Sequence, residues 1–153
     1  MLIHEEPAEY NSWFKLLFLI PIGLFIGAAL FALNQESEAS VALVADGVFF
    51  VLLFFFIMPR KYQIYHDRLK IVQGSPFAIN IPLTTIKEVK HGSGINALVY
   101  FGVRFVTSTK YVIEIVRNKG LNYVISPQNG DIFREQLNQA IESEAHNQYY
   151  SKK

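Results

Sequence analysis

Two long apolar runs lie near the start of the chain, separated by a short polar segment. The runs cover residues 16–33 and 41–58, and Asp46 is the one ionisable residue inside them. Each run has about 18 residues, which at about 1.5 Å per residue approaches the thickness of a hydrocarbon core. We therefore expect two membrane spans, at about 14–33 and 41–58, that form an antiparallel helical hairpin.

An alternating pattern replaces the long runs after Pro59. Apolar residues then recur at every second position in short stretches interrupted by turn residues, a pattern typical of half-buried strands joined by tight turns. The expected strands are 62–64, 69–71, 77–81, 86–90, 98–106, 111–115 and 121–125. The first two flank the turn His66-Asp67, and Gly102 is expected to bend the fifth strand. About seven short strands predict an antiparallel sandwich or open barrel.

A helical period returns at the end of the chain. Ser126-Pro127 has the form of an N-cap with proline at the first helical position, and Asn129-Gly130-Asp131 allows a start a few residues later. Five apolar side chains then fall within one half of a helical wheel. They are Ile132, Phe133, Leu137, Ala140 and Ile141. We expect this helix to cap one open end or face of the barrel.

The predicted fold class is α+β. It consists of a two-helix transmembrane hairpin and then an antiparallel β-barrel or sandwich of about seven strands, capped by a C-terminal helix. We divide the chain into residues 1–59, with the N-terminal segment and the hairpin, residues 60–145, with one soluble domain, and a polar tail, 146–153. Roughly 94 residues after Pro59 suffice for one small domain with its own core.

Basic residues around the spans predict the orientation of the hairpin. The connector 34–40 contains no Lys or Arg, whereas Arg60 and Lys61 follow the second span directly. Cytoplasmic flanks of membrane spans carry an excess of basic residues. We therefore expect a multi-pass protein of the cell membrane with an external connector and with both termini in the cytoplasm.

The first apolar run does not have the features of a cleaved signal peptide. The segment before it carries Glu5, Glu6 and Glu9 against a single Lys15, whereas the start of a signal peptide is net positive. The run also ends in Phe31-Ala32-Leu33, without the small residues that a cleavage site needs. A permanent span is the better interpretation.

Two features within the spans allow more than one interpretation. Gly23 and Gly27 form a GxxxG step, which lets helix backbones approach closely in lipid. The step packs either the two spans of one hairpin or the hairpins of two copies. Asp46 is a candidate functional group because buried charge is costly in a membrane. However, it lies about five residues from the start of its run, where interfacial water reaches it.

Three groups of residues after the hairpin follow the pattern of a known family. They are residues 67–71 with Gly74, residues 81–83 with Ile86 and Val89, and residues 123–127 with Phe133 and Leu137. In order and spacing, the chain resembles the bacterial pleckstrin-homology-like (PH-like) domains that follow transmembrane hairpins in prokaryotic membrane proteins. The resemblance implies a seven-stranded, strongly bent sheet capped by a C-terminal helix. It implies no catalytic residues.

The sequence contains no pattern that predicts catalysis, a metal site or a cofactor. The chain has no cysteine, and its four histidines are dispersed at positions 4, 66, 91 and 146. None of them has the spacing of a metal site on one element. Gly92-Ser93-Gly94 lacks the third glycine and the following helix of a dinucleotide site. We expect a protein that is not an enzyme and has no cofactor.

The charge of the strand region predicts a binding role. Between Arg60 and Gly130 there are ten basic residues and three acidic ones. We expect a membrane-anchored module that binds a protein partner, or a second copy of itself, at the inner membrane face. The alternative is binding of anionic lipid headgroups through Lys61, Arg68 and Lys70, because each cation near an anionic leaflet gains about 1 kcal/mol. A small transporter or channel component that uses Asp46 is less favoured, and no nucleic-acid partner is expected.

Overall fold

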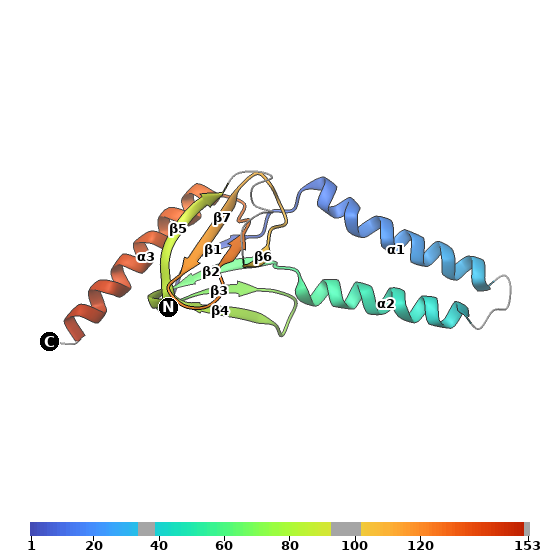
Figure 1. Ribbon diagram of the computed structural model, residues 1–153, viewed down its shortest axis with the longest axis horizontal. Helices are drawn as coiled ribbons and strands as arrows, with labels where there is room; N and C mark the ends of the chain where they lie inside the picture. Colours follow the sequence, from blue (N-terminus) through green and yellow to red (C-terminus); the bar gives the residue numbers. More distant parts are fainter. Residues whose placement is uncertain (34–38, 93–101, 152–153) are drawn as a thin grey trace.

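The computed structural model describes residues 1–33, 39–92 and 102–151, which form a helical hairpin and a two-sheet β domain with a long helix (Figure 1). The elements, in chain order, are β1 (Leu2–Pro7), α1 (Ser12–Leu33), α2 (Ala39–Ile57), β2 (Lys61–Tyr65), β3 (Arg68–Val72), β4 (Ala78–Pro82), the 3-10 helix η1 (Leu83–Thr85), β5 (Ile86–Gly92), β6 (Val103–Phe105), β7 (Val112–Arg117), β8 (Tyr123–Ile125) and α3 (Gly130–Ser151). Within the described residues, the strands form two four-stranded sheets, ordered β1-β2-β3-β4 and β5-β7-β8-β6. The predicted α+β class, with two sheets and a C-terminal helix, is confirmed.

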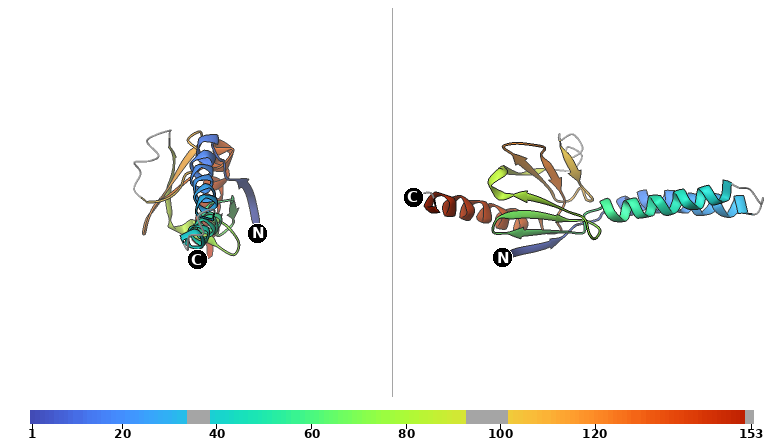
Figure 2. Two further views of the ribbon diagram at one scale, coloured as in Figure 1. Left: turned by 90° about the vertical axis from the view of Figure 1, so that its right-hand side faces the viewer. Right: turned by 90° about the horizontal axis from the view of Figure 1, so that it is seen from below.

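Helices α1 and α2 lie side by side and project from one end of the β domain (Figures 1 and 2). They have 22 and 19 residues, which corresponds to lengths of about 33 and 28 Å. Among the described residues, Phe14–Ala32 of α1 is long and apolar enough to cross a membrane, whereas the apolar part of α2, Val41–Ile57, is shorter. Many large apolar side chains of both helices are exposed, so the hairpin has little core of its own.

Strand β1 is not predicted by the sequence pattern. It pairs antiparallel with β2, with Glu5 opposite Gln63 and Pro7 opposite Lys61. The chain therefore leaves the sheet after Pro7, passes through both helices and re-enters the sheet at Lys61. In other words, the helical hairpin is the connection of a β-hairpin. Residues 2–7 belong to the β domain, whereas the division made from the sequence groups them with the hairpin.

Strands β2, β3 and β4 lie where the alternating pattern predicts them, and the turn at His66-Asp67 is confirmed. Paired residues of neighbouring strands share one face of a sheet. On the inner face, the buried residues Ile64, Leu69 and Ile81 lie opposite one another across the three strands. They belong to one apolar core that extends to the second sheet and to α3.

The second sheet differs from the prediction in one respect. Strand β6 pairs with β8 in parallel, whereas an all-antiparallel arrangement was expected. The reason is the strand order, because β8 lies between β7 and β6, and the chain runs from β6 to β7 before it returns. The described strand here is Val103–Phe105, and residues 98–101 of the predicted strand lie outside the described residues. The predicted bend at Gly102 is confirmed: its φ is +148°, and a Cβ there would overlap the Asn122 carbonyl oxygen.

Helix α3 packs its apolar face on the core that lies between the two sheets. It begins at Gly130, which agrees with the later of the two predicted starts, and it continues to Ser151. Phe133 and Leu137 are fully buried, and the ring centroid of Phe133 lies 5.9 Å from that of Tyr62. Ile132, in the same half of the helical wheel, is 54% exposed. Ile132 lies at the margin of the apolar half of the wheel, where it does not reach the sheets.

Replacement of Phe133 tests the role of α3 as a cap. Phe133→Ala should lower the free energy of unfolding by about 3 to 5 kcal/mol, because it removes a fully buried ring and leaves a cavity. Denaturant unfolding of the full chain in detergent micelles measures this change. Ile132→Ala is the matched control on the same turn and should cost less than about 1 kcal/mol. Equal losses for the two variants would contradict the packing of α3 on the sheets.

Candidate binding surface

The first sheet has a polar face opposite to its core, which we call the outer face. Its side chains alternate with the buried ones, and they include a row that crosses all four strands. In this row Glu5 pairs with Gln63, Gln63 with Lys70, and Lys70 with Asn80. Lys61, Tyr65 and Arg68 lie on the same face, since each is two residues from a member of the row. The three cations singled out in the sequence are thus brought together on one surface.

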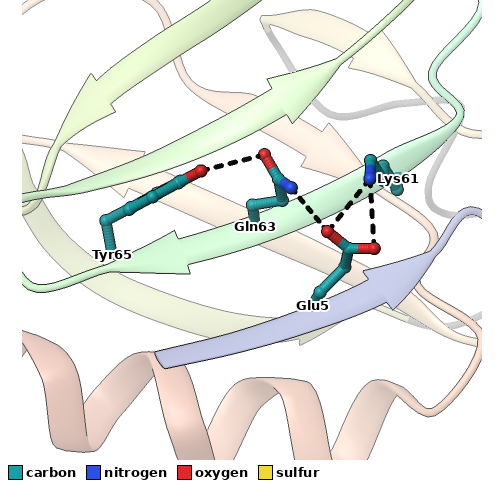
Figure 3. Close-up of polar contacts among 4 residues, drawn as sticks. All are labelled: Glu5, Lys61, Gln63 and Tyr65. Atoms are coloured by element: carbon teal, nitrogen blue, oxygen red, sulfur yellow. Dashed lines mark hydrogen bonds and ion pairs between the residues drawn. The ribbon is translucent and has the colours of Figure 1, made fainter. Parts of the chain in front are cut away.

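A hydrogen-bond network orders one half of the outer face (Figure 3). The Lys61 ammonium group lies 3.1 Å from both carboxylate oxygens of Glu5. Gln63 Nε2 donates to the same carboxylate at 2.5 Å, and the Tyr65 hydroxyl donates to Gln63 Oε1 at 3.3 Å. The hydrogen bond from Gln63, followed by the bond from Lys61, lowers the pKa of the Glu5 carboxyl below its usual range. Lys61 therefore has an anionic partner on the protein itself.

Arg68 and Lys70 lie in the other half of the outer face. The Arg68 guanidinium is 3.4 Å from the Asp67 carboxylate and 5.3 Å from the centroid of the Tyr65 ring. Arg68 follows the β2–β3 turn, whose His66 amide approaches the Met1 carbonyl oxygen at 3.4 Å. This turn lies at the end of the sheet away from the hairpin (Figure 1). The cations therefore extend from the hairpin side of the face, at Lys61, to its far end, at Arg68.

The end of the sheet next to the hairpin is fixed by contacts that the sequence pattern does not predict. The Ala8 amide donates to the Arg60 carbonyl and the Glu9 amide donates to the Ser126 carbonyl, both at 2.9 Å. The Tyr10 hydroxyl donates to the Pro59 carbonyl at 2.5 Å, and burial raises the pKa of Tyr10 to about 12. We call these residues, 8–10 and 59–60, the root of the hairpin. They join the start of α1 and the end of α2 to the β domain.

Glu6 has a structural role that its place in the acidic N-terminal segment does not reveal. Its carboxylate is buried and accepts hydrogen bonds from the backbone amide of Asn129 at 3.0 Å and from the Asn129 side chain. Asn129 immediately precedes α3, so the carboxylate lies at the positive end of that helix. The His4 imidazole lies 3.1 Å from the same carboxylate. The first strand is thus joined to the last helix.

The glycine step does not join the two helices of the hairpin. A Cβ at position 23 or 27 would have no described atom within 4 Å beyond the local helix backbone, whereas a Cβ at Gly47 would lie 3.3 Å from that of Phe25. Gly23 and Gly27 are each two residues, hence about 200° on the helical wheel, from Phe25. Packing of α1 on α2 therefore uses a different face of α1. Contact of Gly23 and Gly27 with a second copy stays a prediction.

Asp46 is exposed on α2, one residue before the glycine that contacts Phe25. Within residues 1–33, 39–92 and 102–151, no group of three or more His, Asp or Glu side chains could hold a metal ion. Gly92 ends β5, and the rest of the Gly92-Ser93-Gly94 segment lies outside the described residues. In the described part of the chain, the outer face is the surface on which the singled-out cations converge.

Comparison with protein families identifies the β domain. Residues 60–140 match the model of the bacterial PH domain. The chain belongs to the bacterial PH domain family. No significant match is found among curated proteins or among solved structures. The matched segment contains β2 to β8 and the first half of α3, so β1 and the hairpin precede it, and the resemblance inferred from the sequence is confirmed.

The hydrogen-bond network on the outer face leads to a prediction about the pKa of Glu5. Gln63→Leu should raise the pKa of Glu5, because it removes the hydrogen bond that contributes most to the lowering. Since the pKa of Glu5 is lowered in the folded protein, its stabilising contacts are complete above the usual carboxyl range and are lost as the pH falls through the lowered value. A carboxyl-detected NMR titration of Glu5 measures the shift. Tyr65→Phe is the control, because its hydroxyl bonds to Gln63 and not to Glu5; an unchanged pKa in Gln63→Leu would contradict the assignment.

Proposed function

We propose that this protein is a two-span membrane protein that holds its PH domain at the cytoplasmic face of the membrane. The main support is the packing of the hairpin. By length and composition α1 qualifies as a span, and α2 lies alongside it with its own apolar side chains exposed. A helix packed on a spanning helix enters the bilayer with it. The absence of Lys and Arg in the connector, against Arg60 and Lys61 at the end of α2, favours a cytoplasmic PH domain.

The role that we infer for the PH domain is non-catalytic binding of a protein partner, or of a second copy, through the outer face. This face carries an ordered polar row across four strands, and its side chains at Lys61, Arg68 and Asn80 remain accessible. The hydrogen bonds of Glu5 and Gln63 hold part of the face in one arrangement before any partner binds. Such preorganisation lowers the entropic cost of binding. This ordered row is the observation that carries the proposal.

The position of the cations favours a protein partner over the bilayer surface. From the level of Lys61 to that of Arg68, the sheet extends over four residues away from the hairpin. At about 3.3 Å per residue this amounts to about 13 Å, which exceeds the screening length of about 8 Å at physiological salt. Lys61, the cation nearest to the hairpin, is paired with Glu5. Anionic headgroups beside the hairpin would therefore attract Arg68 only weakly, and lipid binding by this face is the second candidate.

A photo-crosslinking side chain at Asn80 separates these candidates. Asn80 is exposed at the end of the polar row, next to Lys70. In bacterial membranes we expect a discrete protein adduct, whose mass distinguishes a second copy from another protein. Its yield should fall about tenfold when Arg68 and Lys70 are both changed to Glu, because like charges then face the partner's acidic groups.

The control for this experiment carries the same crosslinker at Lys119, an exposed position on the β7–β8 turn of the other sheet. It should give no adduct that depends on Arg68 and Lys70. A lipid adduct at Asn80 in place of a protein would support the lipid candidate. An adduct pattern that is the same at Asn80 and Lys119 would contradict binding through the outer face.

Reporter fusions test the two-span topology. A reporter that is active only in the cytoplasm should work when fused after Lys153, and a reporter that is active only outside should work when inserted at Ser37. The physical reason is the positive flank at Arg60 and Lys61. Activity of the external reporter at both positions would show that one helix crosses the membrane and that the PH domain is translocated.

A further inference from the structure

The loop between β3 and β4 lies next to the end of α2 (Figures 1 and 2). The loop consists of residues 73–77, of which Gln73, Gly74 and Phe77 contact the last turn of that helix. A Cβ at Gly74 would overlap the Phe55 carbonyl oxygen, so the backbones of loop and helix are in contact. Gln73 Nε2 donates to the Ile57 carbonyl oxygen at 2.9 Å. This loop therefore lies beside residues that belong to the apolar part of α2.

Phe77 is the apolar side chain that the loop presents there. Its ring lies 5.5 Å from that of Phe56, in an edge-on arrangement, and the residue is 54% exposed. Phe77 does not belong to the core of the PH domain, whose members are buried between the sheets and α3. Next to it is an apolar hollow of about 460 Å³. The hollow is lined by Phe49, Leu52, Leu53, Phe56 and Ile57 of α2 and by Gln73 and Phe77 of the loop.

The hydrogen bond from Gln73 suits a site with little water. The last four carbonyl groups of a helix have no partner within it, and in the apolar part of a membrane each unpaired group costs several kcal/mol. Gln73 satisfies the carbonyl of Ile57, the final residue of α2. Arg60 follows at the same end, with its guanidinium 4.1 Å from the centroid of the Phe55 ring. An apolar surface bordered by an exposed cation matches the boundary between acyl chains and phosphate groups.

We propose that the β3–β4 loop is a membrane contact of the PH domain, in which Phe77 inserts among the acyl chains beside α2. An acyl chain of a phospholipid fills the hollow, and its phosphate group lies near Arg60. The hollow extends along α2 from Phe49 to Ile57, a rise of about 12 Å, which is close to the depth of the hydrocarbon of one leaflet. This contact rests on the proposed insertion of the hairpin. It sets the orientation of the PH domain relative to the membrane plane.

Tryptophan fluorescence in liposomes with brominated acyl chains tests the contact. The chain has a single tryptophan, so Trp13→Phe gives a background without emission, and one tryptophan is then introduced into the full chain at each of three places. Phe77→Trp tests the loop, and Leu24→Trp, at a 69% exposed position in the middle of α1, tests the hairpin. Leu121→Trp is the matched control, because Leu121 is 51% exposed on the turn that precedes β8. That turn lies at the end of the domain away from the hairpin, since the Asn118 amide donates to the Thr85 carbonyl near the end of β4.

We expect loss of emission at positions 24 and 77 and none at 121. At position 77 the loss should be larger with bromine near the headgroup than with bromine at the bilayer centre, as interfacial side chains enter by about 5 to 10 Å. Quenching at 24 without quenching at 77 would overturn the loop contact and leave the two-span hairpin standing. Absence of quenching at 24 would overturn the hairpin itself, and the loop contact with it.

A second variant tests whether the packing of the loop sets the depth of Phe77. Gly74→Ala forces the loop away from α2, because the added Cβ overlaps the Phe55 carbonyl oxygen. Combined with Phe77→Trp, it should reduce the quenching at position 77, while the same change combined with Leu24→Trp should leave quenching at 24 unaltered. Unchanged quenching at 77 would contradict the assignment of its depth to this packing.

Discussion

The pairing of β1 with β2 is the contact on which the architecture depends. It joins two segments that lie on opposite sides of the helical hairpin in the sequence, with Pro7 opposite Lys61. Closing a loop of some fifty residues costs conformational entropy. Here much of that loop consists of two packed helices with ends that are already close, which reduces the cost. The strand pairing and the helix packing therefore stabilise each other, and neither segment is a simple appendage of the other.

This arrangement limits how the PH domain can move on its hairpin. A domain attached through one linker turns about that linker, whereas here both helices continue into neighbouring strands of one sheet. The root adds backbone hydrogen bonds from Ala8 to Arg60 and from Glu9 to Ser126, and Gly74 packs on α2. Movement of the domain as a unit would have to break several of these contacts together. The direction in which the outer face points is thus a property of the fold.

The sequence predicted those parts of the fold that depend on local patterns. Strands β2 to β4 carry apolar residues at alternate positions, and β5 and β7 are short stretches with apolar residues that end at turn residues, so their positions could be inferred. Strand β1 was not predicted because two of the residues that face the interior, His4 and Glu6, are polar. Their side chains contact each other, and the Glu6 carboxylate accepts a hydrogen bond from Asn129, which lies over 120 positions further along the chain. The parallel pairing of β6 with β8 is likewise fixed by strand order and not by local sequence.

The same distinction between local and distant contacts applies to the candidate surface. The positions of Lys61, Arg68 and Lys70 on one face follow from their place in two adjacent strands, and the sequence could predict them. The partner of Lys61 could not be predicted, since Glu5 reaches Lys61 only because β1 pairs across the hairpin, whereas Arg68 pairs with its neighbour in sequence, Asp67. The pairing places an acidic residue near the hairpin end of the face, whereas Lys70 and Arg68 lie further from the hairpin. The strand pairing that joins the two ends of the hairpin therefore also places an acidic partner beside the cation nearest to the hairpin.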